Sequence, residues 1–117
     1  MPSLRSLTSK QKYAAYVRDL SADSTCSLCE KDSLKDFLYW KVVENSFPYD
    51  LIAKAHHMLI PIRHIHEAHL NNKELAELRS LKLGVLRAEY DYILENTFKN
   101  KSIPGHFHLH LLVGIPR

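Results

Sequence analysis

The chain gathers its chemically versatile side chains into three short windows. Of its eight histidines, five lie between His56 and His69, and the other three are His106, His108 and His110. The two cysteines, Cys26 and Cys29, form a C-x-x-C pair. Imidazole and thiolate are common zinc ligands, and imidazole also acts as a nucleophile or a proton carrier. These residue types indicate a metal site, a catalytic site, or both.

The alternating sequence HFHLHLLV at 106–113 predicts a strand. The three histidines then share one face, which we expect to lie outside the core, while Phe107, Leu109 and Leu111 share the other. With a rise of about 3.3 Å per residue, the outer histidines would be roughly 13 Å apart, too far to hold one metal ion together. A row of imidazoles suits a phosphate ester better, since it can supply a nucleophilic nitrogen, hydrogen-bond donors and a general acid.

The cysteine pair lies in a polar stretch, Ser21–Ser33, which predicts a loop on which both thiols can converge. Two such thiolates are half of a tetrahedral Cys₂His₂ zinc site, and they are too close in sequence for a structural disulfide. A thioredoxin-like oxidoreductase is another use of C-x-x-C, but it needs the pair after a strand and at the start of a helix. The flanking residues SADSTC and CEKDS favour neither element.

Local patterns predict the elements that position these residues. Thr8 and Gln11 form a capping-box pattern, which predicts a helix from about Ser9 to Leu20. The aromatic and β-branched run FLYWKVV at 37–43 predicts a strand with one apolar face, made of Leu38, Trp40 and Val42. A turn at Asn45–Asp50 and a strand at His56–Ile60, ended by Pro61, are expected to follow.

The second half of the chain predicts one long helix before the triad strand. Asn71 and Glu74 form a capping-box variant, and apolar residues at helical spacing continue to about Glu95. Asn96–Gly105 is then expected to be a loop.

Two segments resemble a known family. The sequence HFHLHLL at 106–112 matches the H-φ-H-φ-H-φ-φ signature of the histidine triad (HIT) superfamily of nucleotide hydrolases and transferases. About 50 residues upstream, HHMLIPIRH at 56–64 resembles that family's H-x-L-V-I-P-x-x-H segment. With the cysteine pair, the resemblance spans roughly Cys26 to Leu112. It implies an α+β, HIT-like fold: a mostly antiparallel sheet, one long helix packed on it, a short N-terminal helix, and a homodimer.

The resemblance also implies roles for individual histidines. His108 would attack the α-phosphorus of a nucleotide ester or phosphoramidate and form a nucleotidyl-histidine, which water or another acceptor resolves. His110 would hydrogen-bond the phosphate oxygens, and His56 would support the site from the neighbouring strand. The partner implied is therefore a nucleotide or dinucleotide.

Some HIT relatives that carry the same C-x-x-C bind zinc with two further motif histidines. Transferred here, that resemblance implies a structural zinc site of Cys26, Cys29, His64 and His106. It selects these two histidines over His57, His66 and His69. A fully occupied four-ligand site leaves no open position for water, so the expected role is structural.

The chain departs from the family pattern just before the triad. Typical members carry N-x-G-x-x-x-G-Q-[S/T]-V there, which binds the α-phosphate, whereas residues 96–105 contain no Gly-Gln pair. Ser102, Lys99 and Lys101 are candidate substitutes as nucleotide-binding donors, with a solvated basic loop as the alternative.

Two further residues have open assignments at this point. Asn45 resembles a ribose-contacting loop residue, and its alternative is an ordinary turn asparagine. Trp40 is either part of a base pocket or, as strand tryptophans usually are, part of the core or a dimer interface.

Composition limits the remaining function classes. The 16 basic and 13 acidic residues give a net charge of +3 without a block of like charges, so we expect neither sequence-specific nucleic-acid binding nor membrane binding. The N-terminus has no signal-peptide core, no stretch of 18 apolar residues occurs, and we expect a cytoplasmic protein. The 117 residues fit a single domain, 1–117. Its apolar strand face and long helix favour a homodimer. The alternative to an enzyme is a zinc-stabilised nucleotide-binding module with little or no turnover.

Overall fold

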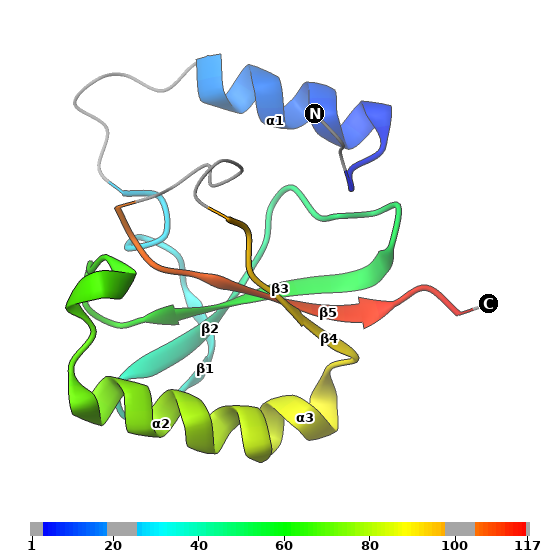
Figure 1. Ribbon diagram of the computed structural model, residues 1–117. Helices are drawn as coiled ribbons and strands as arrows, with labels where there is room; N and C mark the ends of the chain where they lie inside the picture. The colour runs from blue at the N-terminus through cyan, green and yellow to red at the C-terminus, as the bar shows by residue number, and fades with distance from the viewer. Residues whose placement is uncertain (1–3, 19–25, 98–104, 117) are drawn as a thin grey trace.

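The computed structural model describes residues 4–18, 26–97 and 105–116. Its elements are, in order, α1 (Leu7–Arg18), β1 (Ser33–Asp36), β2 (Trp40–Glu44), β3 (Ala53–Pro61), the 3₁₀ turn η1 (Glu67–His69), α2 (Asn72–Leu83), α3 (Val85–Glu89), β4 (Tyr92–Leu94) and β5 (Leu109–Gly114). The described strands form one five-stranded antiparallel sheet in the order β1-β2-β3-β5-β4. Figure 1 shows this sheet as a middle layer, with α1 on one side and α2 and α3 on the other. The α+β fold class predicted from the sequence is confirmed.

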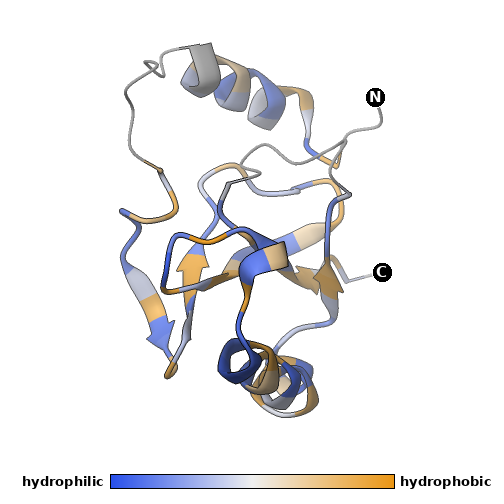
Figure 2. Ribbon diagram, turned by 60° about the vertical axis from the view of Figure 1, so that its left-hand side comes forward, coloured by the Kyte–Doolittle hydropathy of each residue, from blue (hydrophilic) through white to orange (hydrophobic). Residues whose placement is uncertain are grey.

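The main core lies between the sheet and α2. Phe107, Leu109 and Leu111 are buried there together, as their alternation predicts. Trp40 is fully buried in the same cluster, donates from Nε1 to the Glu74 carbonyl (2.9 Å), and meets the Phe107 ring edge-on. Trp40 is therefore a core residue, which settles its open assignment against a base pocket. Figure 2 shows the strongly hydrophobic stretches of the central strands between the two helical layers.

The start of α2 follows the predicted capping box. Asn71 Oδ1 accepts from the Glu74 backbone N–H (2.8 Å), and the Glu74 carboxylate accepts from the Asn71 N–H (3.0 Å). The buried Glu74 carboxylate also pairs with Arg63 at 2.6 and 3.1 Å. The end of β3 is thereby tied to the first turn of α2.

The long helix predicted as far as Glu95 is wrong beyond Leu83. Gly84 leaves the helical conformation (φ −111°, ψ −108°), and only the five residues of α3 continue the path. Residues 92–94 instead form β4, which pairs with β5 through Tyr92↔Leu112 and Leu94↔His110. Pairing with β5 outweighs the helical periodicity, because it satisfies the backbone of a strand that would otherwise be an open edge.

The strand predicted at 37–43 is also displaced. β2 begins at Trp40, and residues 37–39 turn back from a strand that the sequence did not indicate, β1. The Glu77 carboxylate accepts the backbone N–H groups of Leu38 and Tyr39 at this turn (3.1 and 2.7 Å). Leu38 is consequently exposed, while Val42 is buried in the core. The apolar strand face invoked for a dimer is therefore covered within the chain, apart from Leu38.

The N-terminal helix begins earlier than its predicted cap. α1 starts at Leu7, and the Ser6 hydroxyl, rather than Thr8, accepts the N–H of Ser9 (3.3 Å). Ser6 also binds the Asp50 carboxylate through its N–H and its hydroxyl (2.6 Å each), and Ser9 donates to the Pro48 carbonyl. These contacts fasten α1 to the predicted turn before β3, Asn45–Asp50. The predicted end of this helix, Leu20, lies outside the described residues.

The triad strand is shorter than the alternation suggests. β5 begins at Leu109, so His106 and His108 precede it. The Phe107 N–H donates to the Ile65 carbonyl (2.9 Å), which draws this segment toward the chain after β3. All three triad histidines are buried, with exposed fractions of 0%, 4% and 3% in chain order. The histidine face is therefore buried, but none of the three belongs to the hydrophobic core clusters of the described residues, as expected for the face opposite Phe107, Leu109 and Leu111.

None of the helices in the described ranges is both long enough and apolar enough to cross a membrane.

Candidate functional site

Cys26, Cys29, His64 and His106 meet at one place in the fold. Cys26 and Cys29 lie on a tight turn closed by a hydrogen bond from the Cys29 N–H to the Cys26 carbonyl (3.1 Å). The Cys29 sulfur is 3.2 Å from His64 Nδ1 and 3.3 Å from His106 Nδ1, and the four ligand atoms lie within 4.8 Å of one another. Both cysteines are free thiols. The predicted quartet is thus close enough to bind a single metal ion, and its donor set is consistent with zinc.

The hydrogen bonds of His106 fit a role as a metal ligand. Its Nε2–H donates to the Pro61 carbonyl (3.0 Å), so its Nδ1 lone pair faces the cysteines. A carbonyl that fixes the tautomer in this way is typical of metal-ligating histidines. Burial lowers the pKa of His106, which keeps the ring neutral. Partial burial and the Cys26 thiol raise the pKa of the Cys29 thiol, so a bound cation is what would favour its thiolate.

The other upstream histidines are engaged elsewhere. His57 Nδ1 forms a hydrogen bond with the Tyr90 hydroxyl (2.7 Å). His66 caps the 3₁₀ turn by accepting the N–H of Ala68, and His69 is exposed at the end of that turn. Their positions agree with the choice of His64 and His106.

His108 is held by a backbone carbonyl. Its Nδ1–H donates to the His106 carbonyl oxygen (3.0 Å), so in the neutral ring the Nε2 atom carries the lone pair. Its ring meets that of His110 edge-on, with centroids 5.2 Å apart. The imidazole that the resemblance singles out as the nucleophile therefore has an unprotonated nitrogen and a neighbouring histidine.

His56 and His110 are neutral, and their hydrogen bonds fix which nitrogen of each ring carries the proton. The Tyr49 backbone N–H donates to His56 Nδ1 (2.9 Å), which leaves the proton of His56 on Nε2. This Nε2–H donates to His110 Nδ1 (2.7 Å), so the proton of His110 lies on its Nε2. Burial, strengthened by Arg5 and neighbouring histidines, lowers the pKa of His56 to about 3 and that of His110 to about 2. His110 thus presents a neutral N–H donor.

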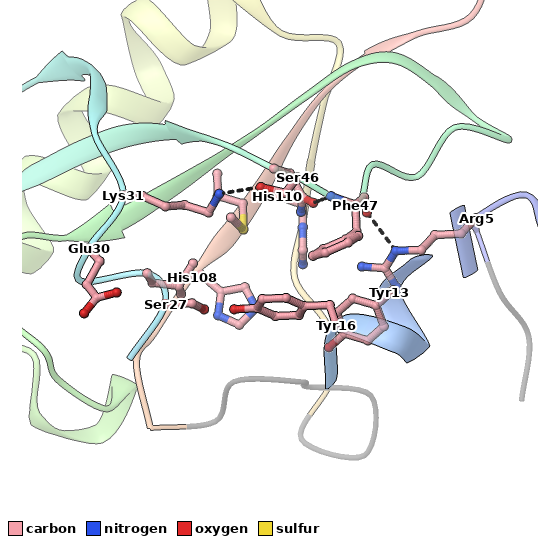
Figure 3. A pocket seen from close by; sticks show the side chains of 13 residues that line it. Arg5, Tyr13, Tyr16, Ser27, Glu30, Lys31, Ser46, Phe47, His108 and His110 are labelled. Atoms are coloured by element: carbon pink, nitrogen blue, oxygen red, sulfur yellow. Dashed lines mark hydrogen bonds between the residues drawn. The ribbon is translucent and has the colours of Figure 1, made fainter. Parts of the chain in front are cut away.

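A pocket of about 680 Å³ opens beside these histidines. Figure 3 shows His108 and His110 between Lys31 on one side and Arg5, Tyr13 and Tyr16 on the other. Its walls come from α1 and the residues before it, the cysteine turn, the loop after β2, β3, and the segment that enters β5. The lining residues are Arg5, Tyr13, Tyr16, Ser27, Leu28, Glu30, Lys31, Asn45, Ser46, Phe47, Met58, His108 and His110. Tyr13 and Tyr16 contact Phe47, with ring centroids 5.2 and 5.0 Å apart.

Asn45 lines this pocket, but its own contacts are those of a turn residue. Its Oδ1 accepts the N–H of Phe47 (2.7 Å), the pattern of an Asx turn, and its Nδ2 lies 3.3 Å from His56 Nε2. The other predicted nucleotide-binding residues, Lys99, Lys101 and Ser102, lie outside the described residues.

Sequence reasoning missed the parts of the site that come from α1 and from Tyr49. The sequence predicts the helix that carries Tyr13 and Tyr16 but not their place beside the histidines, although the two sit three residues apart on α1 and so share a face. The ring of Tyr49, in Phe47-Pro48-Tyr49, lies against His56 and His110, with centroids 4.5 and 4.8 Å away. An aromatic residue directly after the turn proline was the available signal.

The sheet and the helices packed on it give the chain an α+β fold whose known relatives can be sought by comparison. No protein-family model matches the chain, and a search of curated proteins finds no match. Among the solved structures that match is a protein described as "Hit Like Protein", with 24% sequence identity and a TM-score of 0.54. The alignment covers 73% of this chain and 87% of the other. This likeness supports the fold that the resemblance implies.

Proposed function

We propose that the protein is a nucleotide hydrolase or nucleotidyl transferase that works through a covalent intermediate on His108. The observation that carries this proposal is the bond from His108 Nδ1 to the His106 carbonyl, which directs an Nε2 lone pair to the pocket region shared with His110. Nε2 attacks the α-phosphorus, a P–N bond forms, and the bond from phosphorus to the leaving group breaks. Water or another acceptor then displaces the histidine, which splits one difficult displacement into two.

The neighbouring groups support this chemistry. The His110 Nε2–H is a neutral donor that can bind a phosphate oxygen as charge develops there. The aromatic group Tyr13, Tyr16 and Phe47 offers stacking faces for a nucleobase. A volume of about 680 Å³ is in the range of small-molecule sites.

We propose that zinc occupies the Cys26, Cys29, His64 and His106 quartet. When bound there, it would supply cross-linking of the cysteine turn to the triad segment rather than reaction chemistry, because all four positions are taken by protein ligands. The same His106 whose Nδ1 faces the thiols also provides the carbonyl that holds His108. The proposed metal site therefore fixes the residue that orients the nucleophile.

The test is a search for the covalent intermediate. Protein is mixed with adenosine phosphoramidate or a dinucleoside polyphosphate, products are separated by chromatography, and the chain is weighed by intact mass spectrometry. We expect product and a nucleotidyl adduct with the wild type and with His69→Ala, whose histidine is exposed and is not among the residues that line the pocket. His108→Ala should lose turnover by at least about 10³-fold and form no adduct. Wild-type turnover by this variant would overturn the assignment.

The missing Gly-Gln segment favours a second candidate, a zinc-stabilised nucleotide-binding module with little or no turnover. It predicts that the wild type binds a nucleotide monophosphate while leaving both substrates intact. Calorimetric binding measured beside the turnover assay separates the two functions.

We also propose that the chain forms a homodimer through the edge of β4. Within the described residues, β4 has a strand partner on one side only. Exposed apolar side chains surround a groove of about 700 Å³ beside it, namely Leu51, Ile52, Tyr92, Ile93 and Ile115. A second copy could pair with this open edge and cover those side chains. Sedimentation at micromolar concentration should give twice the chain mass of 13.6 kDa, and Ile93→Lys should shift it to the monomer. A wild type that sediments as a monomer would contradict the proposal.

A further inference from the structure

Lys31 and Ser46 form a polar edge along one wall of the pocket. Lys31 Nζ donates to Ser46 Oγ (2.9 Å), and both residues line the pocket. Figure 3 shows the Lys31 side chain extended toward Ser46. Lys31 follows the cysteine turn, whereas Ser46 lies in the loop after β2, so this contact joins two walls of the pocket. We call the pair the Lys31–Ser46 edge.

The Lys31–Ser46 edge offers two neighbouring hydrogen-bond donors. An ammonium group carries three hydrogens and accepts none. One of these hydrogens is used on Ser46 Oγ, and neither ion pair among the residues that the structure describes involves Lys31. The Ser46 hydroxyl, which accepts from Lys31, still has its own hydrogen to donate. Two adjacent acceptor atoms on a ligand would therefore complete the edge.

The surroundings of the Lys31–Ser46 edge suit a flat ring better than a phosphate group. Leu28 and Met58 line the same pocket and are buried together in one apolar cluster. The Lys31 backbone N–H donates to the Leu28 carbonyl (3.4 Å), which keeps the lysine next to this apolar floor. A nucleobase has apolar faces and a polar edge, whereas a phosphate group has no apolar face. The edge and the floor together therefore match a nucleobase.

Among purine bases, two adjacent donors match a 6-oxopurine. Guanine presents two neighbouring acceptors, O6 and N7, on one edge, and hypoxanthine has the same pair of atoms. Adenine keeps the N7 acceptor but carries an amino group in place of O6, so a donor would face a donor. A polar site discriminates between ligands of similar shape in this way, because the wrong ligand leaves its hydrogen-bonding groups without partners.

We propose that Lys31 and Ser46 select nucleotides whose base is a 6-oxopurine, by donating to its O6 and N7 atoms. The inference rests on the proposed function, because the Lys31–Ser46 edge lines the pocket that contains His108. It names a substrate class that the histidines do not distinguish, since their proposed task concerns the phosphoryl group. An adenine nucleotide still enters the pocket and binds with lower affinity.

The experiment compares two nucleotides that differ at the atom facing the edge. Calorimetry gives the dissociation constants of inosine monophosphate, adenosine monophosphate and inorganic phosphate for the wild type, Lys31→Met and Ser46→Ala. Lys31→Met keeps an apolar stem and removes the ammonium group. Lys54→Met is the matched control, since Lys54 is exposed on β3 and does not line the pocket. Thermal melting verifies that each variant is folded.

We expect the wild type to bind inosine monophosphate about 10-fold more tightly than adenosine monophosphate, the contribution of one charge-assisted hydrogen bond. Lys31→Met should remove this preference, mainly by weakening the binding of the inosine compound. Ser46→Ala should reduce the preference by a smaller factor, because it removes a neutral donor. Lys54→Met should keep the wild-type preference, and inorganic phosphate should bind equally to the wild type and Lys31→Met.

The remaining outcomes separate the inference from the proposed function. Equal affinity of the wild type for the two nucleotides overturns the inference and leaves the proposed function standing. If Lys31→Met weakens inorganic phosphate and both nucleotides alike, the lysine binds the phosphoryl group and the inference is again overturned. A Lys31-dependent preference in a protein that gives neither product nor nucleotidyl adduct supports the inference and overturns the catalytic function. Absence of binding by both nucleotides overturns the two together.

Discussion

His106 lies just before β5 and His110 near its start, four positions further on; both are buried, yet they have different kinds of partner. His106 donates to a backbone carbonyl and turns its Nδ1 lone pair toward two thiols. His110 Nδ1 accepts a hydrogen bond from His56, and His110 Nε2 faces the Tyr49 hydroxyl and the Asn96 amide. The same side chain therefore offers a lone pair at one end of the segment and a hydrogen at the other.

The difference teaches that the second nitrogen of each ring decides what the first can bind. Where one ring nitrogen donates to an acceptor, as His106 Nε2 does to the Pro61 carbonyl, the other nitrogen has a lone pair and can bind a cation. Where one ring nitrogen accepts from a donor, as His110 Nδ1 does from His56, the other nitrogen carries a hydrogen and can bind an anion. His108 lies between them and follows the first pattern through the His106 carbonyl. The metal quartet and the hydrogen-bonded pair His56 and His110 thus lie on either side of His108.

The largest effect is expected from breaking the metal quartet. His64→Gln removes a ligand, so zinc content should fall from about one equivalent to below roughly 0.2, and the melting temperature should fall by about 10 °C or more, since binding energy in such sites contributes to folding. Cys26→Ser should act in the same direction. Metal analysis is carried out on protein purified without added zinc.

His66→Gln is the matched control, because His66 is exposed two residues further on and lies outside the quartet. It should retain zinc and melting temperature. A wild type that contains less than roughly 0.2 equivalents of zinc per chain would contradict the proposed metal site.

The next effect concerns pH and the opposite end of the segment. Burial holds the pKa values of His56 and His110 near 3 and 2 in the folded chain, whereas an unfolded histidine titrates near 6.5. The unfolded state then binds more protons below that pH, so the free energy of unfolding should fall as the pH is lowered from 7.5 to 5. His110→Gln should reduce this slope by up to about 1.4 kcal/mol per pH unit.

Urea unfolding at several pH values measures the slope. The exposed His69→Gln variant should keep the wild-type slope, and the metal ligands are common to all three proteins. The carboxyl groups of Asp50 and Glu74, whose pKa values are lowered by Ser6 and Arg63 respectively, titrate below this range. Equal slopes for wild type and His110→Gln would mean that His110 is not held neutral.

The smallest effect tests the Asn45 turn beside His56. Asn45→Ala removes the acceptor of the Phe47 N–H and should lower the free energy of unfolding by about 1 kcal/mol, the usual contribution of one such hydrogen bond. Chemical denaturation measures this. Adenosine binding by the same variant sharpens the result: a change confined to stability makes Asn45 a turn residue, whereas a several-fold loss of affinity adds a ribose contact.

Patterns confined to a few neighbouring residues predict local structure correctly. They do not predict contacts between segments that are far apart in the sequence. The Asn71–Glu74 capping box was predictable because all its bonds lie within one helical turn. The helix predicted beyond Leu83 was wrong because Tyr92–Leu94 pairs with a strand well separated in sequence. Leu38 was placed on an apolar face because the turn that exposes it depends on Glu77, a residue of α2.

By itself, the sequence determined which atoms are available: two thiols three residues apart, histidines at alternate positions, and apolar residues between them that must enter the core. These follow from residue type and from the period of two along a strand. Only the tertiary structure decided which nitrogen of each ring faces a partner, because that depends on Pro61, Tyr49 and Asn96, which approach from other segments. A proton's place on an imidazole is set by its neighbours in space, and neighbours in space are what the folded chain supplies.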